Sequence, residues 1–346
     1  MSGTLDEAIV ALVPTAPHRI ETIGQGHINT TIRVHGDDGT SWCLQRLNPV
    51  FADGRIVMAN AEMIVAQLRR LGHPTIELAV GGDGRAWHQT TDRSIWRAYR
   101  WIPGQVAADH PTPQWSAIAH HLGSFVAALA DLDDSQVVTV VGRFHDPADR
   151  WRRLEQAIDQ DQAGRRKSCT EDLDRLRRLA DAIWVRTPAP RWHRLPRQIV
   201  HNDTKVANVV VDGAGAPLAL IDLDTTMMGS PLNDLGEFTR GCRGIAGPEH
   251  AEELADLVRA FVDGLGRPVT APEWEGLASA GAVLSFENAT RAMTDHLDGD
   301  RYYELGAGVN LQRCRRHLVR SEVLLAMSPA VAEALDRHAE PDKTPG

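Results

Sequence analysis

Lysine is nearly absent from this sequence. Of the 37 basic residues in the chain of 346, only Lys167, Lys205 and Lys343 are lysines, and the others are arginines. Coding bias is the simplest explanation of this ratio, but the scarcity makes the position of each lysine informative. No lysine precedes Lys167, so a site in the first part of the chain cannot use one.

Cysteine is also scarce, and long apolar runs are missing. Cys43, Cys169, Cys242 and Cys314 are too far apart for a metal-binding knuckle or a Cys-x-x-Cys redox pair. No apolar run reaches the roughly 20 residues that span a bilayer, and the N-terminal segment lacks the features of a secretory signal. These absences predict a cytoplasmic protein that is not inserted in a membrane.

Basic residues are outnumbered by acidic ones. The 46 acidic residues give a formal charge of −9, which argues against a general nucleic-acid or membrane-surface binder. Hydrophobic residues make up 42% and charged residues 24% of the chain, as is ordinary for a packed globular protein. The length allows about two domains.

The pattern of apolar residues changes at Pro103-Gly104. Before it, alternation and turn signals predict strands and one helix, and after it amphipathic runs predict mostly helices. We therefore expect an α+β protein with an N-terminal lobe (1–104) and a C-terminal lobe (105–346). In the first lobe, strands are predicted within residues 19–34, 41–47, 75–80, 86–89 and 94–101, and a helix at 55–71.

The strongest motif lies in the second part of the chain. Residues 201–208 read His-Asn-Asp-Thr-Lys-Val-Ala-Asn, and residues 221–224 read Ile-Asp-Leu-Asp. Phosphoryl transfer needs a carboxylate that accepts the proton of the attacking hydroxyl, and an amide and a second carboxylate that hold magnesium. This spacing, typical of a kinase catalytic loop, predicts Asp203 as the base and Asn208 and Asp222 as Mg²⁺ ligands.

One of the three lysines stands inside this motif. Lys205 follows Asp203 by two residues, where an ammonium group can reach the transferring phosphate as a point charge. A solvated lysine is one alternative, and an Asp203 that only accepts backbone N–H groups in a turn is another. We expect His201 to brace the loop.

A glycine-containing break separates two predicted strands near the N-terminus. Residues 23–30 read Ile-Gly-Gln-Gly-His-Ile-Asn-Thr. Glycines there let the backbone approach a phosphate and present N–H groups to it. Alone, the pattern also fits a plain hairpin, and its position ahead of the kinase-like loop favours phosphate binding.

These motifs resemble those of the aminoglycoside phosphotransferase and choline kinase superfamily, which shares the protein-kinase fold. The chain is most similar to its N-acetylhexosamine 1-kinases. The implied fold is bilobal, with a small antiparallel-sheet N-lobe and a larger, mostly helical C-lobe. The resemblance is carried by residues 24–29 (GQGHIN), 44–48 (LQRLN), 96–99 (WRAY), 144–146 (FHD), 201–205, 221–225 and 294–303 (TDHLDGDRYY).

The resemblance implies that the first lobe binds ATP. Gly24 and Gly26 would cover the phosphates, and Asn29 belongs to the same stretch. Backbone groups from Tyr99 to Trp101 would form the hinge that meets adenine.

The strand lysine that protein kinases use to hold the α- and β-phosphates is missing. Gln45 and Arg46 stand at the matching strand. Arg46 therefore either contacts phosphate in place of the lysine or forms a salt bridge with Glu62.

The resemblance also implies an acceptor site in the second lobe. An arginine and an aspartate suit sugar hydroxyls, and an aromatic ring suits the face of a sugar. A helical i,i+4 ion pair between Arg291 and Asp295 is the structural alternative. Gly241 departs from the family, in which an aromatic residue often follows the arginine that matches Arg240. The matching acceptor positions are Thr225, Arg291, Asp295 and Tyr302.

The expected reaction transfers the γ-phosphoryl group of ATP, with Mg²⁺, to the anomeric hydroxyl of a sugar, with an N-acetylhexosamine as the favoured acceptor. One alternative is a kinase of the same fold acting on an amino alcohol, a hydroxyamino acid or an aminoglycoside. The other is a non-catalytic nucleotide-binding module, which would be expected to lack one of Asp203, Asn208 and Asp222. The oligomeric state stays open.

Overall fold

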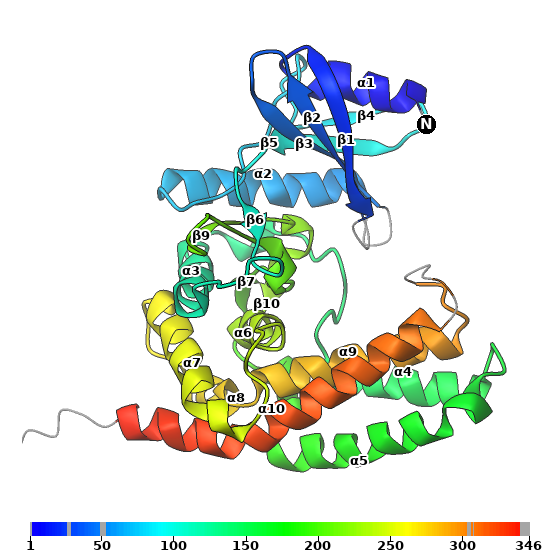
Figure 1. The fold of residues 1–346 in the computed structure, drawn as a ribbon, viewed down its shortest axis with the longest axis vertical. Coiled ribbons are helices and arrows are strands. Elements are labelled where there is room, and N and C mark those ends of the chain that lie inside the picture. Colours follow the sequence, from blue (N-terminus) through cyan, green and yellow to red (C-terminus); the bar gives the residue numbers. More distant parts are fainter. Residues whose placement is uncertain (1, 26–28, 49–52, 303–305, 307, 340–346) are drawn as a thin grey trace, which may run out of the picture. The chain divides into compact units, whose positions relative to one another are not determined.

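Contacts between residues divide the chain into two units (Figure 1). The computed structural model describes residues 2–25, 29–48, 53–302, 306 and 308–339. The first unit comprises Met1–Pro113, Ala128–Gly142 and Asn208–Met227, and the second comprises Gln114–Ala127, Arg143–Ala207 and Met228–Gly346. Antiparallel sheets dominate the first unit and helices the second, which confirms the predicted α+β class.

The first unit is built on a five-stranded antiparallel sheet of order β1-β2-β3-β5-β4. All five strands overlap segments that were predicted as strands. Their bounds are β1 (Pro17–Gln25), β2 (Thr30–Gly36), β3 (Ser41–Arg46), β4 (Trp87–Gln89) and β5 (Ile95–Arg100).

The strand predicted at residues 75–80 is wrong. Only an isolated bridge joins Leu78 of this segment to Tyr99 of β5. On the same edge of β5, residues 95–97 already pair with β4, so only the last residues of β5 are left for the segment. Strand β4 and the segment around Leu78 therefore share this edge of β5, and neither pairs with the whole length of the strand.

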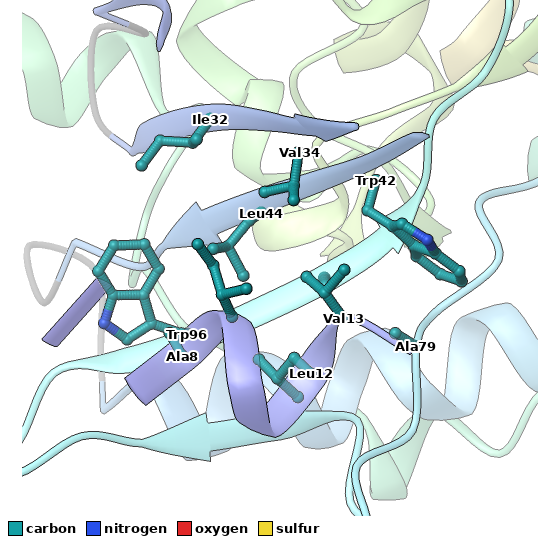
Figure 2. Packing of buried hydrophobic residues seen from close by; sticks show 11 residues of the cluster. Ala8, Leu12, Val13, Ile32, Val34, Trp42, Leu44, Ala79 and Trp96 are labelled. Carbon is teal, nitrogen blue, oxygen red and sulfur yellow. The ribbon is translucent and has the colours of Figure 1, made fainter. Parts of the chain in front are cut away.

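Helix α1 (Ser2–Leu12) covers one face of the sheet and is an addition to the predicted elements. Its apolar residues Leu5, Ala8, Ile9 and Leu12 recur at helical spacing, which is typical of an amphipathic helix. Figure 2 shows the cluster that Ala8, Leu12 and their neighbours form with the sheet, and Leu5 packs against this cluster. The sheet and its flanking loop contribute Ile32, Val34, Trp42, Leu44, Ala79, Trp96 and Ala98 to this cluster.

The opposite face of the sheet carries a polar centre. Side chains alternate along a strand, so Gln45 of β3 and Arg97 of β5 point away from α1. The two residues are directly opposed in the register and both are buried. Helix α2 (Gly54–Arg70), which confirms the helix predicted at 55–71, begins after Asp53, whose side chain accepts the N–H of Arg55.

A three-stranded sheet in the first unit positions two of the predicted metal ligands. Its strands are β6 (Gln105–Val106), β8 (Val209–Val211) and β9 (Pro217–Leu220), in the order β6-β8-β9. Asn208 directly precedes β8, and the segment with Asp222 directly follows β9. The Ile221 amide donates to the Asn208 carbonyl at 2.9 Å, so the two segments run side by side.

The second unit is organised around helix α9 (Ala280–Leu297), which is buried on nearly all sides and packs against α4, α6 and α10. Strand β7 (Gln198–Val200) pairs with β10 (Met227–Gly229). Within the described residues, no helix is long and apolar enough to cross a membrane. The other helices are α3 (Trp115–Ala128), α4 (Pro147–Gln160), α5 (Thr170–Arg186), α6 (Pro231–Thr239), α7 (Ala251–Leu265), α8 (Ala271–Leu277) and α10 (Val309–Ala339).

Candidate active site

The loop after β7 carries the predicted base, Asp203, and is held by one buried carboxylate. The two oxygens of Asp234, in α6, accept hydrogen bonds from the backbone amides of His201 and Asn202, at 3.0 and 2.6 Å. Thr204 Oγ1 donates to the carbonyl oxygen of Asp234 at 2.6 Å. Asn202 has a left-handed φ of +64°, which is uncommon outside glycine and needs fixed surroundings.

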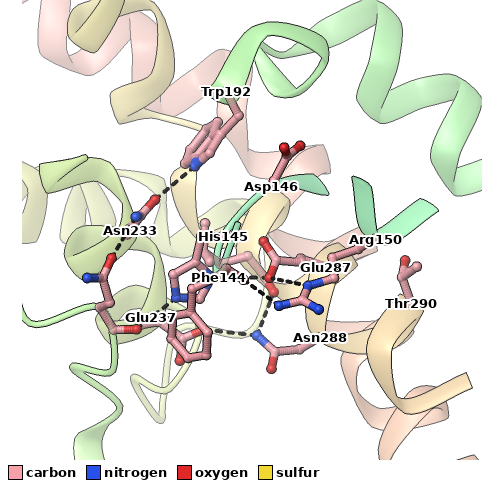
Figure 3. Close-up of polar contacts among 12 residues, drawn as sticks. Phe144, His145, Asp146, Arg150, Trp192, Asn233, Glu237, Glu287, Asn288 and Thr290 are labelled. Atoms are coloured by element: carbon pink, nitrogen blue, oxygen red, sulfur yellow. Dashed lines mark hydrogen bonds and ion pairs between the residues drawn. The ribbon is translucent and has the colours of Figure 1, made fainter. Parts of the chain in front are cut away.

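Side-chain hydrogen bonds also fix Asn202. Trp192 Nε1 donates to Asn233 Oδ1, as Figure 3 shows, and Asn233 Nδ2 donates to Asn202 Oδ1, both at 2.9 Å. His145 Nε2 donates to the Asn202 carbonyl oxygen at 2.7 Å. A Cβ at Gly229 would lie 2.3 Å from Asn202 Oδ1, so glycine permits this close packing.

A buried charged network, drawn in Figure 3, is joined to this loop by the hydrogen bond from His145 to Asn202. His145 Nδ1 is 3.2 Å from Glu287 Oε1, and Arg150 Nε is 3.8 Å from the same oxygen. Burial lowers the pKa of His145, but the Glu287 carboxylate raises it, and the net shift is upward. Asn288 Nδ2 donates to Glu237 Oε1 at 2.9 Å, which ties α9 to α6.

Burial gives the anchoring carboxylate an unusual protonation equilibrium. Burial raises the pKa of Asp234 to about 7, while the backbone amides of His201 and Asn202 work in the opposite direction. A buried carboxylate keeps its charge only where hydrogen bonds replace water. The two amides supply those bonds here.

The structure brings the two predicted catalytic residues together. Lys205 Nζ donates to Asp203 Oδ2 at 2.6 Å, so the lysine is paired rather than simply solvated. The side chains of Asp203 and Lys205 are 21% and 31% exposed, which leaves both accessible to a ligand. A proton acceptor and a positive charge therefore lie next to each other on the second unit.

The predicted metal ligands, Asn208 and Asp222, lie in the first unit. Asn208 is buried, and the side chain of Asp222 is 32% exposed. Their amide and carboxylate oxygens are hard donors that fit Mg²⁺, which retains waters and needs few protein groups. Among the described residues, no cluster of three or more His, Cys, Asp or Glu side chains could hold a metal ion. The donors thus fit a cation that arrives with phosphate oxygens.

An ion pair beside Asp222 was not predicted. Arg97 Nη1 donates to Asp224 Oδ1 at 2.5 Å, and Arg97 Nη2 lies 3.9 Å from Asp222 Oδ1. Burial lowers the pKa of Arg97, but the carboxylates of Asp224 and Asp222 raise it, and the net shift is upward. Both partners stand in stretches that carry the resemblance, residues 96–99 and 221–225, and that was the signal that could have identified them.

The predicted phosphate-binding residues are only partly described. Gly24 lies in β1, and Gly26 lies outside the described residues. Asn29 is buried; its Nδ2 donates to Asp224 Oδ2 at 2.7 Å, and its Oδ1 accepts the N–H of Asn48 at 2.9 Å. Its amide thus holds protein groups together, and its contact with a nucleotide stays a prediction.

Arg46 lies at the end of β3 with its side chain 46% exposed. Its Nε donates to Ser94 Oγ at 2.9 Å, and its Nη2 lies 3.9 Å from Asp92 Oδ2. Glu62, the alternative partner, instead accepts the N–H of Ala86 at 3.2 Å. Arg46 therefore contacts Ser94 and Asp92 in place of the expected partner Glu62. A contact of Arg46 with phosphate stays a prediction.

The predicted hinge continues from β5. Tyr99 is buried within this strand, whereas Trp101 is half-buried. The Trp101 amide donates to the Ser41 carbonyl at 2.8 Å, and the Arg33 guanidinium stacks on the Trp101 ring, 4.3 Å from its centroid. The segment is thus firmly attached to β3, and its contact with adenine stays a prediction.

A pocket in the second unit brings together three of the four predicted acceptor residues, Arg291, Asp295 and Tyr302. Its walls come mainly from α4 and α9. The fourth residue, Thr225, is buried in the first unit. Substrate contact by all four stays a prediction.

The charged groups of this pocket are mostly arginines. Asp295 is committed to structure, because its oxygens accept the N–H of Tyr302 at 2.8 Å and Asn310 Nδ2 at 2.7 Å. The Arg291 guanidinium stacks on the Phe144 ring, 5.3 Å from its centroid. The charged lining residues are Arg150, Arg153, Arg291, Asp295 and Asp298.

Comparison with known families identifies the class of protein. Residues 19–279, well over half of the chain, match the model of the phosphotransferase enzyme family. The chain belongs to this family. It is thus an enzyme that transfers a phosphoryl group to a hydroxyl acceptor.

Solved structures share the fold over nearly the whole chain. Spectinomycin phosphotransferase APH(9)-Ia, in complex with ADP and spectinomycin, is 13% identical with a TM-score of 0.61, covering 93% of this chain and 95% of that chain. Amicoumacin kinase hAmiN, in complex with AMP-PNP and Ca²⁺, has the same identity and TM-score and covers 92% of each chain. An aminoglycoside phosphotransferase from Alicyclobacillus acidocaldarius is 14% identical with a TM-score of 0.59, covering 96% of each chain. The fold is therefore kinase-like.

Proposed function

We propose that this phosphotransferase uses ATP and Mg²⁺ to phosphorylate a neutral sugar at its anomeric hydroxyl, with an N-acetylhexosamine as the favoured acceptor. The observation that carries the proposal is the Asp203–Lys205 pair, at 2.6 Å, on a loop fixed by buried hydrogen bonds. Such a pair supplies the two functions that phosphoryl transfer requires of side chains, a proton acceptor and a positive charge.

Asp203 orients the acceptor hydroxyl and receives its proton. The hydroxyl oxygen forms a bond to the γ-phosphorus while the bond from that phosphorus to the β,γ-bridging oxygen breaks, and ADP leaves. Lys205, released from its ion pair as Asp203 becomes protonated, offsets charge on the transferring group. No covalent enzyme intermediate is needed.

Asn208 and Asp222 would hold the metal ion. A Mg²⁺ ion held there would neutralise phosphate charge and orient the phosphate oxygens. Asn208 contributes a buried, positioned amide, and Asp222 contributes the more exposed carboxylate.

The charge of the pocket supports a neutral acceptor. A polycationic aminoglycoside requires carboxylates that are free to pair with its ammonium groups. Here Asp295 is engaged by Tyr302 and Asn310, and three arginines line the same pocket. Guanidinium groups are good donors to sugar hydroxyl and acetyl oxygens.

The first experiment is a substrate panel. The protein is incubated with ATP, Mg²⁺ and either sugars, amino alcohols, aminoglycosides or macrolides, and ADP release is followed. We expect turnover with an N-acetylhexosamine, and phosphorus NMR of the product should place the phosphate on the anomeric carbon. Turnover confined to another class would overturn the proposed acceptor but leave the phosphotransferase chemistry standing.

The second experiment removes the proton acceptor. Asp203→Asn should lower kcat by about 10²- to 10⁴-fold, the usual contribution of general base catalysis, with ATP affinity nearly unchanged. Asp181→Asn, on an exposed position of α5, is the matched control and should behave as the wild type. An Asp203→Asn variant with normal kcat would contradict the role of the base.

A further inference from the structure

The first unit has no lysine, yet a buried cation lies next to its metal-binding carboxylate. Arg97 on β5 is only 1% exposed, and its guanidinium makes three directed approaches. Nε donates to Gln45 Oε1 at 2.9 Å, Nη1 donates to Asp224 Oδ1 at 2.5 Å, and Nη2 lies 3.9 Å from Asp222 Oδ1. A guanidinium can serve three groups at once because its N–H groups are arranged in a planar fork.

Both carboxylate oxygens of Asp224 accept hydrogen bonds in this arrangement. Its Oδ1 accepts from Arg97 and its Oδ2 accepts from Asn29, which directly precedes β2. Of the two neighbouring aspartates, Asp222 is therefore the one whose carboxylate is exposed. We call the four residues Asn29, Gln45, Arg97 and Asp224 the Arg97 clamp.

The backbone at Asp222 has an uncommon conformation next to this clamp. Its φ of +64° and ψ of +59° are left-handed, a conformation that is uncommon outside glycine although aspartate adopts it more readily than most residues. Asp224 lies two residues later, in the 3₁₀ turn Leu223–Thr225 that begins directly after Asp222. The clamp therefore fixes the turn immediately after Asp222.

We propose that Arg97 is a positioning residue that supplies a fixed, buried positive charge in the first unit and, through Asp224, holds Asp222 ready for a metal–nucleotide complex. This inference rests on the proposed function. Arg97 acts through other residues because its burial leaves no surface for a ligand. Arg46 cannot replace it, since strand alternation points Arg46 to the α1 face of the sheet and Arg97 to the other.

Arg97→Lys is the sharpest test. The variant keeps the charge and the pairing with Asp224, but a lysine cannot also reach Gln45 and Asp222 in the same geometry. We expect a folded protein in which amides 221–226 exchange hydrogen about tenfold faster. We also expect the Kd for Mn²⁺–AMP-PNP, measured by calorimetry, to rise about tenfold, as for the loss of one charged hydrogen bond. AMP-PNP with EDTA should be affected less.

Two further variants keep the test decisive. Arg69→Lys, at an exposed position of α2 in the same unit, is the matched control and should leave both readouts unchanged. If Arg97→Lys does not fold, Arg97→Gln/Asp224→Asn removes both charges together, so that no buried charge is left unpaired. The double variant should show the same faster exchange and weaker binding.

Unchanged hydrogen exchange at amides 221–226 in a folded variant would show that the Arg97 clamp does not hold the turn, and would overturn the proposal. Faster exchange with unchanged Mn²⁺–AMP-PNP affinity would also overturn the proposal, because the clamp would then be structural only. If the wild type binds no metal–nucleotide complex, the proposed function fails. The exchange measurement then still decides whether Arg97 holds the turn.

Discussion

Two loops in this protein each contain a residue with a left-handed backbone, and different interactions hold them in place. In the second unit, Asn202 has a φ of +64° next to Asp203, and in the first unit Asp222 has the same φ. The catalytic loop is held by a buried carboxylate, Asp234, that binds backbone amides. The Asp222 turn is held by a side-chain ion pair between Asp224 and Arg97.

The difference has an energetic consequence. Backbone amides are present whatever the sequence, so an anchor that uses them depends on one side chain only. An ion pair depends on two side chains, and the loss of either one leaves the other charge buried without a partner. The first unit should therefore be more sensitive to single substitutions at its anchor than the second.

Breaking the ion pair should have the largest effect. Arg97→Met leaves the Asp224 carboxylate buried and unpaired, which typically costs about 3–5 kcal/mol of unfolding free energy. Urea denaturation of the full chain measures this loss. The double variant Arg97→Met/Asp224→Leu should recover most of it, and a single variant within about 1 kcal/mol of the wild type would refute the comparison.

Asp234→Asn should have a smaller effect. The amide can accept one of the two backbone N–H groups but presents its own N–H₂ to the other, which costs about 1–3 kcal/mol. The same urea experiment measures it, and kcat should fall as the Asp203 loop loosens. A loss larger than that of Arg97→Met would reverse the proposed order of the two anchors.

The pH dependence of stability separates the anchors further. Burial raises the pKa of Asp234 to about 7, above its unfolded value near 3.8, so the folded protein binds the proton more tightly. The corresponding stability is present below about pH 4 and is lost as the pH rises through about 7. Calorimetric Tm values between pH 5 and pH 8 should therefore fall more steeply for the wild type than for Asp234→Asn. Parallel curves would show that Asp234 does not titrate in this range.

The smallest effect concerns the outer support of the catalytic loop. Trp192→Phe removes the donor to Asn233 Oδ1 and should cost about 0.5–1.5 kcal/mol, with little change in kcat. Trp274→Phe is the control, because Trp274 is 37% exposed. A kcat loss as large as that of Asp234→Asn would mean that Trp192 positions the loop directly.

The catalytic motif was predictable because it is local. Residues 201–208 are contiguous in the sequence, and Lys205 pairs with Asp203, two residues away. Helix α1 has an amphipathic pattern, but its segment is short, and it was considered only as evidence against a secretory signal. Pattern alone therefore identified the five strands of the large sheet, helix α2 and the mostly helical character of the second part of the chain.

The anchors of these loops were not predictable in the same way. Arg97 and Asp224 are 127 positions apart, and His145 and Asn202 are 57 apart. Whether such residues meet depends on strand register and on helix packing, which no local spacing encodes. The missing lysine suggested Arg46 as a substitute cation, because Arg46 stands at the matching strand. Arg97 lies opposite Gln45 on the neighbouring strand, and the sequence alone does not give that strand register.

The scarcity of lysine has a practical consequence for labelling. Lys167 is exposed in the 3₁₀ turn Arg166–Cys169, whereas Lys205 is only 31% exposed and paired with Asp203. A lysine-specific protease therefore releases residues 168–205 as one fragment, with Lys205 at its end. Acylation of Lys205, read as a missed cleavage at that single position, reports ligand occupancy at the catalytic loop, and Lys167 provides an internal reference in the same digest.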